Sequence, residues 1–265
     1  MYPFFEIFSI RIYTFWFSIT IIFFLFYRML GKLSSRFNYD FNLFKANILW
    51  FFISTFIFSR LFYILSQWND MKFIKKFFEF FIMSDYNFSL YWAIFGFFLI
   101  LAINIKIRKE NIIKYIDGVV LSFTFVLVLG YIWAFLWGQV YWSPTNLWIE
   151  IKYSNSNSLV PFTVPIFPLP IIYSILSFLL FSSLYILKMY IKTKWFIWYL
   201  GLWAFASISL IFEFFSWKDD IFSVKFFLNF NQICAIILLF FVWRILYNMI
   251  KIASFEGTMN IFNKE

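Results

Sequence analysis

The chain has no histidine, one cysteine and few charged residues among its 265 positions. Histidine is the commonest metal ligand and the usual general base near neutral pH, so its absence excludes most histidine-based chemistry. The one cysteine, Cys234, cannot form an intrachain disulfide, and we expect it to pack within the apolar run QICAIILLFF. The remaining ligand types are too few for a zinc or iron–sulfur site, so no metal and no cofactor is expected.

Charge is scarce as well: charged residues make up 13% of the chain, hydrophobic residues 63%, and the mean hydropathy is +0.82. A soluble domain has about a quarter of its residues charged. Several runs approach or exceed the roughly 20 apolar residues that cross a bilayer core of about 30 Å. The sequence therefore predicts an all-α polytopic membrane protein.

Charged and turn residues divide the apolar runs into seven predicted transmembrane helices, which we expect to form one domain over residues 1–265. The predicted spans are 12–30, 46–66, 89–105, 115–137, 168–187, 195–215 and 231–250. The fifth follows PFTVPIFPLP, which cannot be interior helix before Pro170. The first span lacks a basic leader and a small-residue cleavage site, so no cleavable signal peptide is expected.

Lysine and arginine are distributed unevenly between the two sides of these spans, and the richer side is expected to be cytoplasmic. The richer side holds Arg28, Lys32, Arg36, Lys45, Lys106, Arg108, Lys109, Lys114, Lys188, Lys192, Lys194, Arg244, Lys251 and Lys264. The other side holds Arg11, Lys72, Lys75, Lys76, Lys152, Lys218 and Lys225. The bias predicts an outer N-terminus and a cytoplasmic C-terminus. It also explains the net charge of +9, so no nucleic-acid partner is expected.

Three ionisable residues lie within or at the edge of the predicted spans, where a charge costs on the order of 3 kcal/mol. Arg60, in FISTFIFSRLFYIL, falls near the middle of its span. We expect it to face a polar cavity or an anionic lipid headgroup; the alternative is a buried pair with Glu213 or Asp117. Glu213 lies near the outer end of the sixth span, and Asp117 is expected to be a helix residue favoured by the dipole near the helix start. Tyr13, at the start of the first span, is either interfacial or cavity-lining.

The fourth span ends in an unusual segment, LGYIWAFLWGQVYWSPTNLW, at residues 129–148. Its tryptophans are typical of an outer interfacial belt. Gly130 and Gly138 lie within about 80° of each other on a helix and would allow a helix or a ligand to approach closely. Gly138 and Gln139 are expected to end the helix. Irregular backbone at this depth lines a cavity or is buried in protein.

In this segment the chain resembles the prolipoprotein diacylglyceryl transferases, seven-span bacterial enzymes that transfer a diacylglyceryl group from phosphatidylglycerol to a lipoprotein cysteine. The family frame is approximately G-R-x-G-N-F-x-N-G-E-x-Y/W-G-x-P-T, and here it is G-Y-I-W-A-F-L-W-G-Q-V-Y-W-S-P-T. The matching residues are Gly130, Phe135, Gly138, Tyr141, Pro144 and Thr145. The resemblance continues through the N-terminal segment with Tyr13, SRLFYIL with Arg60, the helix start with Asp117, LIFEFFSWKDD with Glu213, and NQICAII with Gln232.

The departures fall on the residues that would perform the family's reaction. Tyr91 stands at the family's essential histidine, and Tyr131 and Ser209 stand at two arginines. Ala134, Trp137 and Gln139 replace two asparagines and a glutamate, and FPLPIIYS replaces H-P-x-Q-L-Y-E. The reaction must deprotonate a thiol and stabilise a departing glycerol phosphate. A phenol, with a reference pKa near ~10, is a poor substitute for imidazole, and neither tyrosine nor serine supplies the fixed charge of a guanidinium.

The resemblance implies a multi-pass protein of the bacterial cytoplasmic membrane that binds phospholipid of the phosphatidylglycerol class, a lipoprotein precursor, or both. The changed residues predict a catalytically degraded member, a pseudoenzyme that could also pair with an active paralogue. The residues expected to bind lipid are Tyr13, Arg60, Gly130, Gly138, Gln139, Tyr141 and Glu213.

Two alternatives remain open at this point. The chain could be an active transferase with rewired residues, in which Tyr91 or Tyr131 acts as acid or base and Arg60 binds phosphate. It could also be a transporter or a membrane scaffold subunit. A transporter would favour paired broken helices or an inverted repeat, and neither is evident in the sequence.

Overall fold

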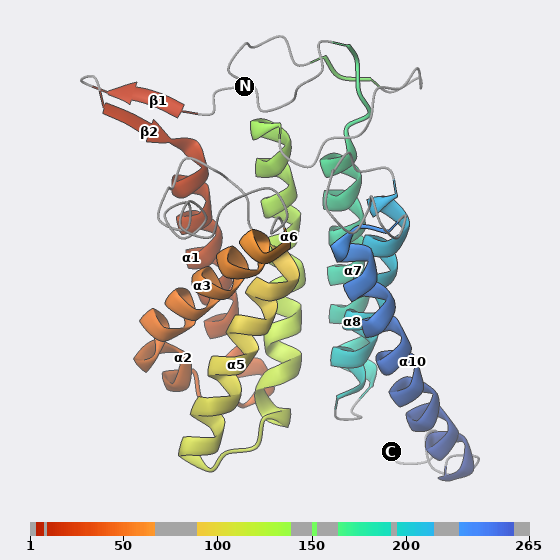
Figure 1. Ribbon diagram of the computed structural model, residues 1–265. Coiled ribbons are helices and arrows are strands. Elements are labelled where there is room, and N and C mark those ends of the chain that lie inside the picture. The colour runs from red at the N-terminus through yellow and green to blue at the C-terminus, as the bar shows by residue number, and fades with distance from the viewer. Residues whose placement is uncertain are drawn as a thin grey trace.

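The computed structural model is a bundle of long helices preceded by a small β-hairpin (Figure 1). It describes residues 4–7, 10–66, 89–138, 150–152, 164–191, 195–214 and 228–256. The elements of this part are β1 (Phe4–Ile7), β2 (Ile10–Tyr13), α1 (Thr14–Phe37), α2 (Asn42–Ala46), α3 (Ile48–Ser66), α5 (Leu90–Arg108), α6 (Ile113–Trp137), α7 (Leu169–Tyr190), α8 (Phe196–Glu213) and α10 (Phe230–Glu256).

The hairpin precedes the first helix, and the predicted start of the first span at residue 12 falls within β2. β1 and β2 pair antiparallel, with Phe4 opposite Tyr13 and Ile7 opposite Ile10. Their sequences, FFEI and IRIY, consist mainly of aromatic and β-branched residues, which favour extended backbone. Pairing also satisfies the backbone polar groups that a single strand would leave open. The helix consequently begins at Thr14.

Six helices of the described part are long and apolar enough to cross a membrane. Their qualifying ranges are Phe17–Phe37, Leu90–Arg108, Lys114–Leu136, Leu169–Tyr190, Phe196–Glu213 and Asn231–Lys251. A shorter apolar stretch, Ile48–Leu61, belongs to α3. Large apolar side chains such as Phe24, Trp50 and Phe240 are mostly exposed, as lipid-facing positions are. The chain is a polytopic α-helical membrane protein.

Two helix boundaries follow from single residues. α6 ends at Trp137 because Gly138 adopts the left-handed conformation, with φ of 72°, and its N–H turns back to the last carbonyls of the helix. This confirms that the helix ends at Gly138. α7 begins at Leu169 and carries Pro170 in its first turn, where the missing N–H has no helical partner to lose.

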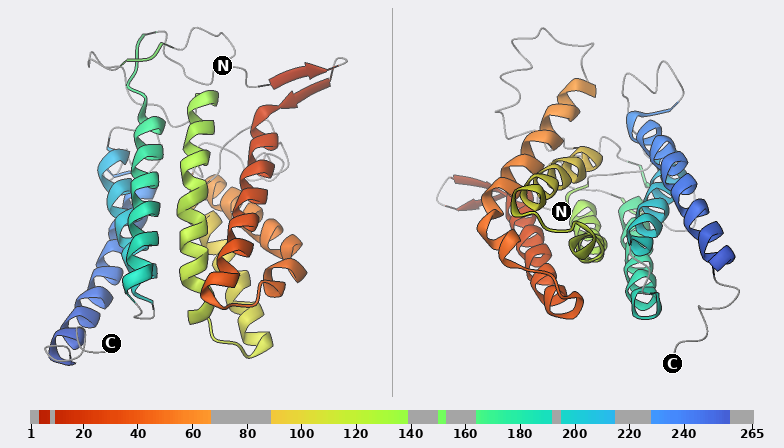
Figure 2. Two further views of the ribbon diagram at one scale, coloured as in Figure 1. Left: turned by 180° about the vertical axis from the view of Figure 1, so that it is seen from behind. Right: turned by 90° about the horizontal axis from the view of Figure 1, so that it is seen from below.

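The helices pack in neighbouring pairs that alternate in direction. α1 packs on α6, α3 on α5, α6 on α7, and α8 on both α7 and α10. Figures 1 and 2 show α1, α3 and α5 on one flank of α6, with α8 and α10 on the far side of α7. α1, α7 and α10 start toward the end of the bundle that carries the hairpin, and α6 and α8 finish there (Figure 1).

A largely aromatic core fills the opposite end of the bundle. Phe44, Phe51 and Phe97 are buried against one another, with ring centroids of Phe51 and Phe97 4.7 Å apart. The Tyr39 hydroxyl donates to the Leu30 carbonyl at 2.6 Å. Contacts of this kind fix α2 against α3 and α5.

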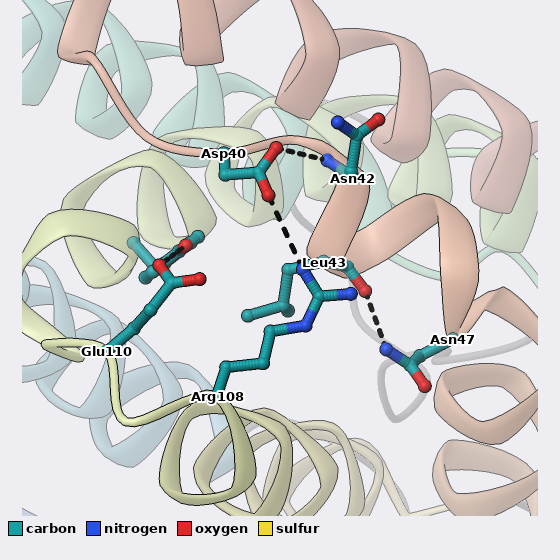
Figure 3. A network of polar contacts seen from close by, with 7 residues as sticks. Asp40, Asn42, Leu43, Asn47, Arg108 and Glu110 are labelled. Carbon is teal, nitrogen blue, oxygen red and sulfur yellow. Dashed lines mark hydrogen bonds and ion pairs between the residues drawn. The ribbon is translucent and has the colours of Figure 1, made fainter.

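A polar network covers this core between the end of α1 and the α5–α6 connection (Figure 3). Arg108 pairs with Asp40 at 3.4 Å, and the other carboxylate oxygen of Asp40 accepts the Asn42 backbone N–H at 2.9 Å. Tyr115 donates to the Glu110 carboxylate. The predicted cytoplasmic ends of three helices are thus held by side-chain contacts (Figure 3).

Candidate functional site

The candidate site lies toward the hairpin end of the bundle, where several helix ends converge (Figure 1). Tyr91 stands in the first turn of α5, Tyr131 in the last two turns of α6, and Glu213 at the last residue of α8. Because antiparallel neighbours place the start of one helix beside the end of the next, residues far apart in sequence meet here. The structure brings together the three positions that the sequence singled out.

Glu213 is the centre of this group. It is 8% exposed, and its Oε1 accepts a hydrogen bond of 2.9 Å from Asn231 Nδ2 of α10. It also interacts electrostatically with Tyr91, Tyr131 and Tyr173, so these three phenols lie within range of one carboxylate. We call this group the polar cluster: Tyr91, Tyr131, Tyr173, Ser209, Glu213 and Asn231.

Two tyrosines of the polar cluster form a stacked pair. The rings of Tyr131 and Tyr173 lie 4.8 Å apart at 20°, and the hydroxyl of the neighbouring Ser174 donates to the Val128 carbonyl at 2.9 Å. These contacts join α6 to α7 beside the carboxylate. Tyr173, which is 3% exposed, was not among the predicted site residues. The sequence could have indicated Tyr173 through its position in FPLPIIYS, the segment that differs from the family pattern.

Tyr91 places a hydroxyl in the interior of the polar cluster. Its Oη is buried beside Ser209, whose side chain interacts with it, although the pair does not reach full hydrogen-bond geometry. A buried hydroxyl whose hydrogen bonding is incomplete is destabilising, and a bound polar group would offset that cost. The position that replaces the family's histidine is therefore a donor that faces the site.

The start of α10 is capped by a reciprocal pair. Gln232 N–H donates to Asn229 Oδ1, and Asn229 N–H donates to Gln232 Oε1, both at 2.9 Å. This capping box holds Asn231 beside Glu213. The Nε2 of Gln232 is buried and has no hydrogen bond within the described part of the chain.

Arg60 lies in α3 and is 3% exposed, so the span does hold a buried cation. The N–H of Ser89, just before α5, donates to the carbonyl of Ser59, the residue before Arg60, at 3.1 Å.

Asp117, considered as a partner of Arg60, forms an ion pair with Lys188 of α7. It lies beyond the first turn of α6, so the expected role at the helix start is wrong, and an interhelical pair takes its place.

Of the remaining predicted site residues, some lie within the described part of the chain and others lie outside it. An added Cβ at Gly130 would meet Ile22 Cδ1 at 3.8 Å, an ordinary contact, so packing with described neighbours does not require glycine there. Tyr13 is the last residue of β2, immediately before α1. Gln139 and Tyr141 lie outside the described residues. Within the described part there is no group of three or more Cys, Asp and Glu side chains that could hold a metal ion.

An apolar cavity of about 390 Å³ adjoins the polar cluster, between α1, α3, α5, α6 and α8. Its few polar lining residues are Thr55, Ser59, Ser89 and Thr124. Phe205, which lines the cavity, contacts the Tyr91 ring at 5.6 Å. The polar cluster and the cavity therefore meet at Phe205, and together they form an amphipathic site inside the bundle.

The comparisons with known proteins agree with this arrangement. The model of the prolipoprotein diacylglyceryl transferase family matches residues 3–247, which is nearly the whole chain. No curated protein matches the chain at a significant level. The match includes every residue of the polar cluster and every residue that lines the cavity. The chain belongs to the prolipoprotein diacylglyceryl transferase family.

Proposed function

We propose that this protein binds a glycerophospholipid of the phosphatidylglycerol class, alone or with a lipoprotein precursor, and has lost the family's transfer reaction. The observation that carries the proposal is the junction of the polar cluster with the apolar cavity at Phe205. A glycerolipid has the same division, with a polar headgroup and ester region joined to apolar chains. The family match supplies the lipoprotein-lipidation setting.

Loss of the reaction follows from the residues that make up the polar cluster. Its described residues are three phenols, a hydroxyl, an amide and one carboxylate. Tyr131 and Ser209 stand where the resemblance implies arginine, so the developing charge on a glycerol phosphate would meet no guanidinium from these positions. Arg60, buried in α3, is the cation that we assign to the phosphate.

The proposal includes the topology. We place α3 as a seventh span beside the six that qualify by length, with the hairpin end outside and the Arg108 end in the cytoplasm. The support is the excess of Lys and Arg at that end and the hydrophobicity of Ile48–Leu61. The whole chain then forms one unit in a bacterial cytoplasmic membrane.

Lipid binding is tested on the purified protein in detergent by native mass spectrometry and thermal unfolding. Phosphatidylglycerol is expected to remain bound and to raise Tm more than phosphatidylethanolamine does, and Arg60→Gln is expected to remove that difference. Arg108→Gln serves as the control, because its guanidinium is part of the network in Figure 3. Equal shifts with both lipids, or an unchanged preference in Arg60→Gln, would overturn the proposal.

The second candidate function is an active transferase with Tyr91 as acid or base. The observation that favours it is the buried Tyr91 hydroxyl, which lies beside Ser209 and interacts electrostatically with Glu213. A lipobox peptide and phosphatidylglycerol supply the assay. Turnover that Tyr91→Phe abolishes would establish this function and reject the pseudoenzyme; absence of turnover in the wild type, with lipid still bound, supports the first proposal.

A further inference from the structure

The apolar cavity has a polar end, which we take as its mouth, and an aromatic end, which we take as its floor. Ser89 and Ser59 line it near the start of α5, and Phe98, two turns further along α5, lines it at the other end beside Trp198. The Phe98 and Trp198 rings meet edge to face at 4.5 Å. α1 closes the same end, where Phe26 packs on Phe97 at 5.3 Å.

We propose that this cavity holds one acyl chain of the bound glycerophospholipid and that Phe98 and Trp198 limit the length of that chain. The inference rests on the lipid binding proposed above and adds a specificity to it. The mouth supplies a polar group for the lipid. Ser89 Oγ is buried there without a hydrogen bond among the described residues, and Ser89 lies two positions before Tyr91. A donor there faces the ester region when the chain runs toward the floor.

The volume favours a single chain. An apolar cavity of about 150 Å³ accommodates benzene, with six carbons, so about 390 Å³ accommodates roughly fifteen. A membrane helix cannot enter, since its diameter with side chains is about 10 Å. An extended peptide would leave its N–H and C=O groups unpaired against this apolar wall. An acyl chain has no polar group beyond its ester and fits both the size and the chemistry.

Selection among acyl chains would depend on how well the length of each chain fits the cavity. A chain that moves from the bilayer into the cavity exchanges one apolar surrounding for another, so burial alone gives little preference. Chains that are too long would have to displace Phe98 or Trp198, and overfilling a packed interior is unfavourable. We therefore expect a sharp decline in binding above about sixteen carbons.

The test uses the full-length protein in detergent with an equimolar mixture of phosphatidylglycerols carrying 14-, 16- and 18-carbon saturated chains. Native mass spectrometry measures the bound fraction of each. Wild type is expected to bind the 18-carbon lipid about fivefold less than the 16-carbon lipid. This factor corresponds to the lower limit of the free energy that overpacking of an interior costs. Trp198→Ala should abolish that difference, and Phe98→Ala provides a second variant with the same expected effect.

Two further variants make the readout specific. Ala93 lines the cavity, so Ala93→Leu should shift binding toward the 14-carbon lipid. Trp50→Ala is the matched control, because Trp50 is 63% exposed and does not line the cavity. This variant is expected to bind the three chain lengths in the same proportions as wild type. An identical chain profile in wild type and in every folded cavity variant would overturn the length limit while lipid binding stands. Failure of wild type to retain any phosphatidylglycerol would overturn the proposed function itself.

Discussion

Replacing Lys188 with methionine would leave the Asp117 carboxylate buried without the cation that pairs with it. The two side chains are 17% and 7% exposed, so the carboxylate is the deeper partner. Its Oδ1 has no hydrogen bond among the described residues, which leaves the Lys188 contact through Oδ2 as its principal compensation. Removing one partner of a buried pair costs about 3–5 kcal/mol. Because Lys188 is partly exposed, we expect about 3 kcal/mol.

The opposite replacement should cost less. Asp117→Asn removes the deeper charge, and Lys188 can then extend its ammonium group toward the interface. We expect about 1.5 kcal/mol, the loss of one hydrogen bond to a charged group. The double variant removes both charges and should lie near the milder single variant, which corresponds to a coupling energy of about 2–3 kcal/mol.

Unfolding by SDS in mixed micelles, followed by circular dichroism, measures these free energies. Lys106→Met is the matched control. Lys106 is exposed in the last turn of α5, so the same substitution there removes a lysine charge without affecting a buried partner. Equal losses in the two single variants, together with strict additivity in the double variant, would refute the assignment of a buried, coupled pair.

Four further variants concern glycine positions and one helix cap, and the same unfolding assay measures them. Gly96→Ala should destabilise by about 1–3 kcal/mol, because the added Cβ would lie 2.7 Å from the Ser54 carbonyl oxygen of α3, whereas Gly130→Ala should be nearly neutral. Gly138→Ala should cost about 1 kcal/mol, since an L side chain is strained at φ of 72°. Asn229→Ala should cost about 1 kcal/mol through loss of the α10 cap. Wild-type stability in any of these destabilising variants would contradict the geometry on which it is based.

Much of the helical architecture could be predicted from the sequence, because crossing a bilayer imposes a length and a hydrophobicity that a single segment must satisfy alone. Helices occur at the predicted places, and Gly138 ends α6 as expected. The N-terminal hairpin was missed because its short strands acquire stability only when they pair, and pairing is not a property of either segment.

The candidate site could be predicted in part. Tyr91 and Tyr131 were singled out from a resemblance and Glu213 as an ionisable residue in an apolar span, and the structure places all three in one polar cluster. Tyr173 and Asn231 were missed, since neither is an ionic residue in an apolar run and each becomes part of the site only through a neighbouring helix. The pairing of Asp117 with Lys188 was missed for the same reason.

The sequence by itself determined the solvent, the presence of several long apolar helices and the family, and it also determined which reactive residue types are absent. Each of these depends on local composition or on residues in fixed order along one segment. Tertiary structure alone decided that three tyrosines lie within electrostatic range of Glu213, that Lys188 compensates Asp117, and that an apolar cavity meets the polar cluster at Phe205. These features depend on how helices rotate and pack against one another, and neither rotation nor packing is encoded in a single span.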